Sequence, residues 1–414
     1  MRNSGALRKP SLRRSNYAEA TNPKESREAG AASFNPKSIV RGIGAMDHTI
    51  LLVVIILAFF GIMMVFSASY VVTGRSARFG HNPFFFLTRH VLFAAIGFIA
   101  LYFMSNFNYK FLKRFAMPLY LVSIGLLIIT AIFGDEGRWL VIPIVDMQFQ
   151  PSEIAKVSLI LVLARLLSRN RQILDTWKGF FFCGAVAGVM AVFVALGNLS
   201  TAIIIAVIGG GMIFMASPHI WRFVAIGGVA GGGMAGYLAF MAIRTAAGYQ
   251  MTGGFRGARV RAWLNPFDYM QSYGFQIVQS LYAVASGGLF GLGIGQSRQK
   301  TFLPEVHNDV IFSVIVEELG FIGGGIILLL FGILIWRGLR IAMNATDSFG
   351  ALVAVGIILM IASQVIINVA VVTNSIPNTG IPMPFISYGG TALLVCMACM
   401  GIILNISRHS KVSK

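Results

Sequence analysis

The sequence predicts an all-α protein that crosses a membrane many times. Of its 414 residues, 56% are hydrophobic and only 12% are charged, and the mean hydropathy is +0.76. A soluble domain carries about 25% charged residues, so this chain has too few charges to coat a globular surface. The apolar run from Thr49 to Phe66 approaches the roughly 20 residues that a helix needs to span the hydrocarbon core. A soluble enzyme is therefore excluded.

Ten apolar segments follow one another along the chain, and we expect each to form a transmembrane helix. They lie at about 48–69, 88–104, 117–133, 151–168, 180–197, 199–216, 221–243, 308–336, 349–373 and 385–406. The predicted ten-helix membrane domain therefore covers 47–407.

Basic tails flank this domain. Residues 1–46 carry nine Lys and Arg against three Glu, with polar residues and Pro between them. This composition predicts a disordered cytoplasmic tail, whose basic residues can contact anionic headgroups. Residues 408–414 form a second, short basic tail. We assign the net charge of +18 to the membrane surface and expect no nucleic-acid partner.

The distribution of Lys and Arg predicts that both termini are cytoplasmic. Basic residues concentrate in the tails and in every second connection between the segments, as the positive-inside rule requires. The connection at 244–306 breaks this pattern, but loops of that length escape the rule. We therefore expect a large extracytoplasmic loop between the seventh and eighth helices.

This loop carries a cluster of arginines, Arg256, Arg259 and Arg261. A solvated loop is one interpretation. The other is a binding surface for a polyanion, because guanidinium groups bind phosphate through paired hydrogen bonds. The glycines between Gly287 and Gly295 could add backbone amides to such a surface, but their spacing and context do not fit a dinucleotide site.

Acidic residues recur where a membrane should exclude them. If a helix begins at Pro304, then Glu305, Asp309 and Glu317 fall at multiples of four residues and share one face. A charged group at the centre of a bilayer costs about 2.5 to 3.5 kcal/mol. Glu317 and the adjacent Glu318 therefore need partners or water, and a buried polar network between helices is the simplest arrangement.

The fourth segment supplies a cation. Pro151 is well suited to a helix start, and Glu153 and Lys156 follow one turn apart. This helix and the one after Asp309 both start at the predicted outer face, so Lys156 and Asp309 should lie at similar depth and can meet. The alternative is a helix-start acid favoured by the helix dipole together with a snorkelling lysine.

Other polar residues interrupt the apolar segments, among them Asn198, Gln364 and Asn368. The stretch 376–390 is rich in Pro and Gly, and irregular backbone near a membrane persists only where protein or a watery cavity satisfies it. We expect this stretch to line a cavity.

The sequence predicts no metal and no cofactor. The six His have no metal-ligand spacing, and Cys183, Cys396 and Cys399 all lie inside apolar segments. On a hydrophobic helix the Cys396-x-x-Cys399 pair is expected to serve packing rather than redox chemistry.

Five motifs resemble those of the SEDS family of shape, elongation, division and sporulation proteins. They occur in the family's order and extend over segments four to ten. They are Gln150-Pro151-Ser152-Glu153-x-x-Lys156, Trp263-Leu264-Asn265-Pro266, Leu303-Pro304-Glu305-x-His307-x-Asp309, Glu317-Glu318-Leu319-Gly320 and Pro384-x-Ile386-Ser387-Tyr388-Gly389-Gly390. The resemblance implies ten transmembrane helices with a large outer loop between the seventh and eighth, in agreement with the hydropathy count. The long polar N-terminal tail favours the division branch, FtsW, over the elongation branch, RodA.

The sequence departs from the family pattern at Asn198. There the family usually reads Gln-Pro-Asp-Leu-Gly, whereas this chain reads Leu196-Gly197-Asn198-Leu199-Ser200. The acid is lost, so no catalytic role is carried over to Asn198.

The resemblance implies a peptidoglycan glycosyltransferase. Such an enzyme polymerises lipid II into glycan strands at the outer face of the bacterial cytoplasmic membrane, here at the division septum. Its implied partners are a class B penicillin-binding protein transpeptidase and other division proteins. Asp309 would be the general base for the acceptor hydroxyl, with inversion at the anomeric carbon, and a divalent cation could accompany the diphosphate.

The remaining candidate residues fall into two groups. The candidate substrate-binding residues are Lys156, Glu153, Glu305, His307, Arg256, Arg259, Arg261 and Ser387. The candidate structural polar network consists of Glu317, Glu318 and Asn368.

Two other functions stay open. One is a lipid II flippase, because intramembrane acids also mark translocation paths, although the sequence has no convincing internal repeat of the kind that transporters often show. The other is a non-catalytic scaffold of the division machinery, in which Asp309 would be replaceable.

Overall fold

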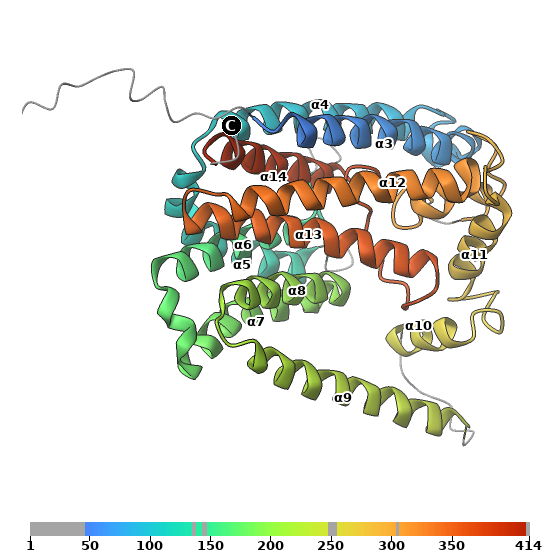
Figure 1. Cartoon of the computed structure of the whole chain (residues 1–414). Coiled ribbons are helices and arrows are strands. Elements are labelled where there is room, and N and C mark those ends of the chain that lie inside the picture. Colours follow the sequence, from blue (N-terminus) through green and yellow to red (C-terminus); the bar gives the residue numbers. More distant parts are fainter. Residues whose placement is uncertain (1–45, 135–137, 143–146, 247–254, 304–305, 411–414) are drawn as a thin grey trace, which may run out of the picture. The chain divides into compact units, whose positions relative to one another are not determined.

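The computed structural model describes residues 46–134, 138–142, 147–246, 255–303 and 306–410. This described part of the chain is almost entirely helical, with one short hairpin (Figure 1). Within it, eight helices are long and apolar enough to cross a membrane. The protein is a multi-pass membrane protein, as its composition predicts. Most of the two predicted tails, and Glu305, lie outside the described residues.

A helix forms at each of the ten predicted segments. They are α3 (His48–Arg75), α4 (Phe85–Asn106), α5 (Leu112–Phe133), α6 (Pro151–Arg169), α7 (Trp177–Gly197), α8 (Leu199–Ala216), α9 (Ile220–Ala246), α12 (Ile311–Met343), α13 (Ser348–Val372) and α14 (Gly390–Arg408). The two that are not among the eight candidate spans are α6 and α9. Because α6 carries Glu153, Lys156 and Arg165, it is too charged to be identified as a span by composition. The count of ten spans stays a prediction.

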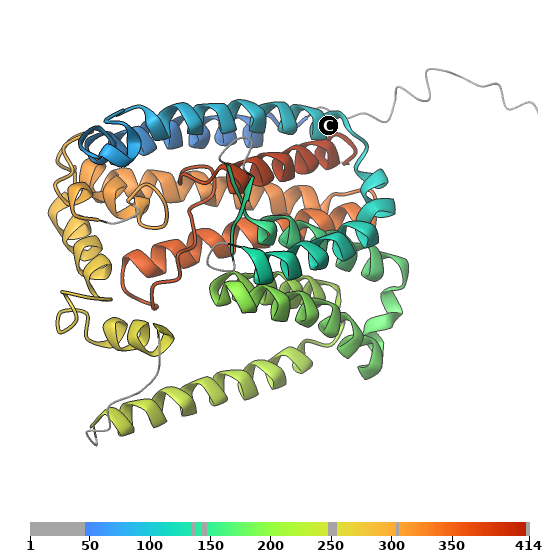
Figure 2. The ribbon, with the colours of Figure 1, turned by 180° about the vertical axis from the view of Figure 1, so that it is seen from behind.

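The charged helix α6 lies in the interior of the domain. It packs against α5, α8 and α13, while α4 packs along α14 and α3 along α12 (Figures 1 and 2). Most residues of α6 from Pro151 to Ala164 are buried. The surrounding helices instead expose large apolar side chains, such as Phe59 of α3 and Phe103 of α4. Protein thus surrounds the polar helix, and apolar side chains face the lipid.

The connections contain short elements that the hydropathy pattern did not predict. The long loop between α9 and α12 holds α10 (Phe255–Leu264), α11 (Phe275–Gly287) and the 3₁₀ turn η4 (Gln299–Thr301). The hairpin of β1 (Leu140–Ile142) and β2 (Met147–Phe149) precedes α6, and Leu140 pairs with Phe149. The other 3₁₀ turns are η1 (Ala77–Phe79), η2 (Tyr109–Phe111) and η3 (Arg171–Asp175).

Helix α12 starts later than Pro304. It begins at Ile311, so Asp309 lies in the turn before the helix rather than on a stripe within it. The helix is also interrupted at Gly320, whose φ of 73° is non-helical. A Cβ there would come within 2.3 Å of the carbonyl oxygen of Leu289, so only glycine fits.

The glycine-rich segment 287–295 satisfies the backbone groups that this interruption releases. The amides of Leu292 and Gly293 donate to the carbonyl oxygens of Glu317 and Glu318, each at 2.9 Å. The amide of Phe321 donates in turn to the carbonyl of residue 288, also at 2.9 Å. The amide of Gly293, one of the glycine amides expected at a phosphate, therefore binds α12 instead.

Candidate functional site

The carboxylate of Asp309 lies among three elements. Its Oδ1 accepts a hydrogen bond from Nε2 of Gln276 on α11 at 3.2 Å. Its backbone carbonyl accepts from Nδ2 of Asn368 on α13 at 2.8 Å, and the same amide donates to the carbonyl of Ile381 at 2.9 Å. The side chain is 9% exposed. Asn368 thus joins the turn at Asp309 to the irregular segment 373–389, and Gln276 orients the carboxylate.

A cavity of about 220 Å³ lies beside Gln276, the hydrogen-bond partner of this carboxylate. It is lined by Arg259, Ser272, Tyr273, Phe275, Gln276, Ile277 and Asn378. Oε1 of Gln276 accepts from Nδ2 of Asn378 at 2.7 Å, and Nη1 of Arg259 donates to the carbonyl of Asn378 at 3.5 Å. Hydrogen bonds therefore connect Arg259, Asn378, Gln276 and Asp309 in that order. The cavity is many times the roughly 10–15 Å³ that a single water needs. It is lined by a cation, Arg259, and by Gln276, which is bonded to the carboxylate of Asp309.

Helix α10 brings the arginine to this cavity. Nε1 of Trp263 donates to the carbonyl of Asn374 at 3.0 Å, and Nδ2 of Asn374 donates back to the carbonyl of Trp263 at 3.4 Å. Arg261 lies on the same helix but is not among the described residues that line the cavity, and the side chain of Arg256 lies outside the described residues. Of the predicted cluster, Arg259 lines the cavity.

Lys156 pairs within its own helix. Its Nζ lies 2.8 Å from Oε1 of Glu153, and both side chains are almost fully buried. The structure therefore brings Lys156 to Glu153, whereas Gln276 is bonded to the carboxylate of Asp309. Because one charge of a buried pair compensates the other, the cation of Lys156 is already partnered.

Ser387 closes a turn inside the segment 373–389. Its Oγ accepts from the amide of Met383 at 2.7 Å, and its own amide donates to the carbonyl of Met383 at 3.1 Å. The side chain is buried and does not line the cavity beside Gln276. The sequence predicts that the stretch 376–390 lines a cavity. Of its residues, Asn378 lines the cavity beside Gln276.

His307 packs in an aromatic cluster. Its ring centroid lies 4.0 Å from that of Phe86 and 5.4 Å from that of Tyr388, and its carbonyl accepts from the amide of Tyr388 at 2.8 Å. Burial, with a smaller contribution from His90, lowers the pKa of His307 to about 4. The imidazole is therefore neutral near pH 7.

Glu317 and Glu318 are both fully buried. Their partners lie in a different part of the chain from those of Asp309. Glu317 accepts from the hydroxyl of Ser297 and from the amides of 298 and 299. Glu318 accepts from the hydroxyl of Ser67 on α3 at 2.6 Å and lies 3.4 Å from Nζ of Lys300. Together they join α12, α3 and the end of the long loop.

Sequence reasoning missed Gln276 and Asn378, which connect Asp309 to Arg259. Gln276 is one of several polar residues at the start of α11, beside Gln279 and Ser280, and Asn378 lies in a stretch rich in Pro and Gly, so neither carries a motif of its own. Among the described residues, no three His, Cys, Asp or Glu are grouped as metal ligands.

Comparisons with known proteins identify relatives over nearly the whole chain. The profile of the cell cycle protein family of FtsW, RodA and SpoVE matches residues 47–412. Stage V sporulation protein E of Bacillus subtilis (strain 168) is 40% identical over 372 residues, which cover 88% of this chain and 98% of that protein. The probable peptidoglycan glycosyltransferase FtsW of Geobacter sp. (strain M18) is 37% identical over 381 residues, covering 90% and 99%.

Solved structures share the fold. A chain from a structure described as "Structural coordination of polymerization and crosslinking by a peptidoglycan synthase complex" matches with a TM-score of 0.69 and 25% identity, over 89% of this chain and 99% of that one. The rod shape determining protein RodA of Thermus thermophilus matches with a TM-score of 0.63 and 24% identity, over 89% and 98%. These matches confirm the resemblance noted from the five motifs.

Proposed function

Because the chain belongs to the cell cycle protein family of FtsW, RodA and SpoVE, we propose that it is a peptidoglycan glycosyltransferase that polymerises lipid II. Several of its relatives bear the name probable peptidoglycan glycosyltransferase FtsW. The observation that carries the proposal is a cavity lined by Arg259, Gln276 and Asn378, from which hydrogen bonds lead through Gln276 to the carboxylate of Asp309.

The reaction needs one base and one cationic group. Asp309 takes the proton of the acceptor sugar hydroxyl while the hydroxyl oxygen forms a bond to the anomeric carbon of the donor. The bond from that carbon to the polyprenyl diphosphate breaks, and the configuration inverts. Arg259 neutralises the charge that develops on the leaving diphosphate. Diphosphate leaves readily, so a second carboxylate acting as general acid, as in glycoside hydrolysis, is not required.

The pairing of Lys156 with Glu153 bears on which cation serves the diphosphate. In the structure Nζ of Lys156 is bonded to Oε1 of Glu153 at 2.8 Å. Lys156 can bind diphosphate only when this pair opens, so Arg259 is the better placed cation.

We assign the protein to the bacterial cytoplasmic membrane at the division septum, with the site at the outer face. A class B penicillin-binding protein is the proposed partner, because the matched chain comes from a complex described as coordinating polymerization and crosslinking. Glu305, His307, Arg256, Arg261 and Ser387 remain proposed substrate contacts.

The decisive experiment is polymerisation of lipid II by the purified protein with its transpeptidase partner. Asp309→Asn should lower the rate by about 10²- to 10⁴-fold, as expected for loss of a general base. Asp268→Asn is the matched control, because Asp268 is an exposed acid of the same loop and should retain activity. Undiminished polymerisation by a folded Asp309→Asn protein would contradict the proposal, and transfer of lipid II across vesicles without polymer would favour a flippase.

A further inference from the structure

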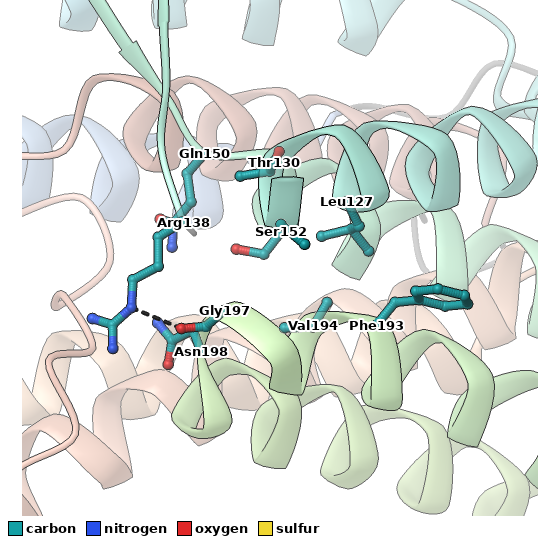
Figure 3. A pocket seen from close by; sticks show the side chains of 10 residues that line it. Leu127, Thr130, Arg138, Gln150, Ser152, Phe193, Val194, Gly197 and Asn198 are labelled. Carbon is teal, nitrogen blue, oxygen red and sulfur yellow. Dashed lines mark hydrogen bonds between the residues drawn. The ribbon is translucent and has the colours of Figure 1, made fainter. Parts of the chain in front are cut away.

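A second cavity lies where α5, α6, α7 and α8 meet, at the N-terminal ends of α6 and α8 (Figure 3). Its polar lining comes from Arg138, Gln150, Ser152 and Asn198. Its volume of about 20 Å³ is enough for one or two atoms the size of a water molecule. It shares no lining residue with the cavity beside Gln276.

Ser152 has a buried hydroxyl that lacks a partner. Its side chain is 6% exposed, and its Oγ makes no hydrogen bond within the described part of the chain. In Figure 3 this oxygen points into the cavity, towards Arg138 and Asn198. Buried hydroxyl groups are nearly always hydrogen-bonded, so the cavity is built to receive a polar atom.

The surrounding groups favour an anion. The N-cap residue of α6, Gln150, makes no side-chain capping bond, which leaves the positive end of the helix dipole uncapped. Arg138 donates through Nε to the carbonyl of Gly197 at 2.9 Å and so holds a guanidinium at the cavity. Among the described lining residues there is no carboxylate, and Glu153 on the same helix is paired with Lys156.

The other half of the cavity is apolar. Leu127 of α5 and Phe193 of α7 line it, and the same two helices expose Ile132 and Val192 at 67% and 63%. A polar cavity with an apolar side, between helices that expose apolar side chains, matches an amphipathic ligand with a phosphate at one end and hydrocarbon at the other.

We infer that this cavity binds a phosphate oxygen of an anionic membrane lipid, at a site separate from the cavity beside Gln276. The phosphate oxygen accepts from Ser152 and from the N-terminus of α6, Arg138 supplies the opposite charge, and the lipid chains lie along α5 and α7. Two sources share this chemistry, a phospholipid such as phosphatidylglycerol and a polyprenyl phosphate.

Asn198 provides a test that preserves the fold. Its Oδ1 caps α8 by accepting from the amides of Ser200 and Thr201 at 3.0 and 3.2 Å. Asp and Ser cap helices about as well as Asn, so Asn198→Asp adds a negative charge at the cavity without removing the cap. Asn198→Ser is the uncharged control.

The measurement is the rise in melting temperature of the purified full-length protein in detergent as dioleoyl-phosphatidylglycerol or undecaprenyl phosphate is added. For at least one lipid, Asn198→Asp should raise the half-saturating concentration by about tenfold or more, because like charges repel in a low-dielectric cavity. Asn198→Ser should leave that concentration unchanged within about twofold. If Asn198→Asp weakens the binding of only one of the two lipids, that lipid class is the source of the bound phosphate.

Ser152→Ala is an independent second variant. It removes an unpartnered hydroxyl, so the melting temperature without lipid should not fall, whereas lipid binding should weaken. Arg259→Gln identifies lipid bound at the other cavity, the one beside Gln276. The effects of Asn198→Asp and Ser152→Ala on lipid binding should persist in the Arg259→Gln background. Equal responses of the unaltered protein, Asn198→Asp and Ser152→Ala to both lipids would overturn the inference and leave the proposed polymerase intact.

Discussion

At the residue scale, two amide side chains position Asp309. Gln276 donates to its carboxylate, and Asn368 donates to its backbone carbonyl. The side chain of Gln276 also accepts from Asn378, so its orientation is determined from both ends. These side-chain amides join the turn at Asp309 to α11, to α13 and to the segment 373–389.

Replacing Gln276 with Leu should slow polymerisation by about tenfold and move the acid limb of the pH–rate profile to higher pH. The reason is that the hydrogen bond stabilises the ionised carboxylate, so its loss favours the protonated form. The rate measured between pH 5 and 9 checks this. Gln279→Leu on the same helix is the control, and an identical pH profile in both variants would remove Gln276 from the site.

Replacing Glu153 with Gln should destabilise the protein by about 3–5 kcal/mol, because the cation of Lys156 would be left buried and unpaired. The double variant Glu153→Gln/Lys156→Met should recover most of that loss. Thermal unfolding in detergent measures both. A double variant as unstable as the single one would show that the pair is not what stabilises α6 here.

Stability should also depend on pH through His307. Its pKa is lowered from 6.5 to about 4 in the folded protein, so between these values only the unfolded chain takes up the proton, and the free energy of unfolding falls as pH falls. His307→Gln should reduce the decrease in melting temperature between pH 7 and 5. The exposed His81→Gln is the control, and equal slopes in the two variants would contradict this assignment.

At the element scale, the interrupted helix α12 depends on the glycine segment that pairs with it. The interruption at Gly320 would leave carbonyl and amide groups unsatisfied near the membrane, which is costly. The segment 287–295 satisfies them and is held there by Glu317 and Glu318 through residues 297–300. The loop, the interruption and the buried acids therefore form one structural unit.

Gly320→Ala should be strongly destabilising, by more than about 1–3 kcal/mol, since its backbone lies in the left-handed region and a Cβ would lie 2.3 Å from a carbonyl oxygen. Gly325→Ala, five residues along α12, has open space around its Cβ position and should be neutral or stabilising by up to about 1 kcal/mol. Melting temperatures compare the two. Equal effects would mean that α12 tolerates a continuous helix at Gly320.

At the scale of the whole molecule, polar groups lie inside the domain and apolar side chains lie outside it. α6 carries its ion pair in the interior, while α3 and α4 expose phenylalanines. Protein partners can hold a charged helix in the membrane where lipid cannot. The prediction that α6 crosses the membrane is therefore compatible with its charge, although its composition alone does not identify it as a span.

The count of ten spans is testable through the flanks of α6 and α9. Single cysteines at Gln148 and Gln172 should be labelled from opposite sides of the membrane, and so should cysteines at His219 and Asp268, because each pair flanks one predicted crossing. An impermeant maleimide on intact cells, in a variant lacking Cys183, Cys396 and Cys399, makes the measurement. Labelling of both members of a pair from one side would remove that crossing.

Local features of the sequence determined the helical class and the ten helical segments, and they singled out Asp309, Glu317 and Glu318 as acids that need partners. The apolar length and the charge of a segment are properties of about 20 consecutive residues, so they can be judged from the sequence. An acid in such a segment requires a partner. The tertiary structure alone decided which partners these are. Gln276 and Asn378 stand 102 positions apart, and Ser67 and Glu318 stand 251 apart. Such contacts depend on how distant segments pack, which no local pattern in the sequence records.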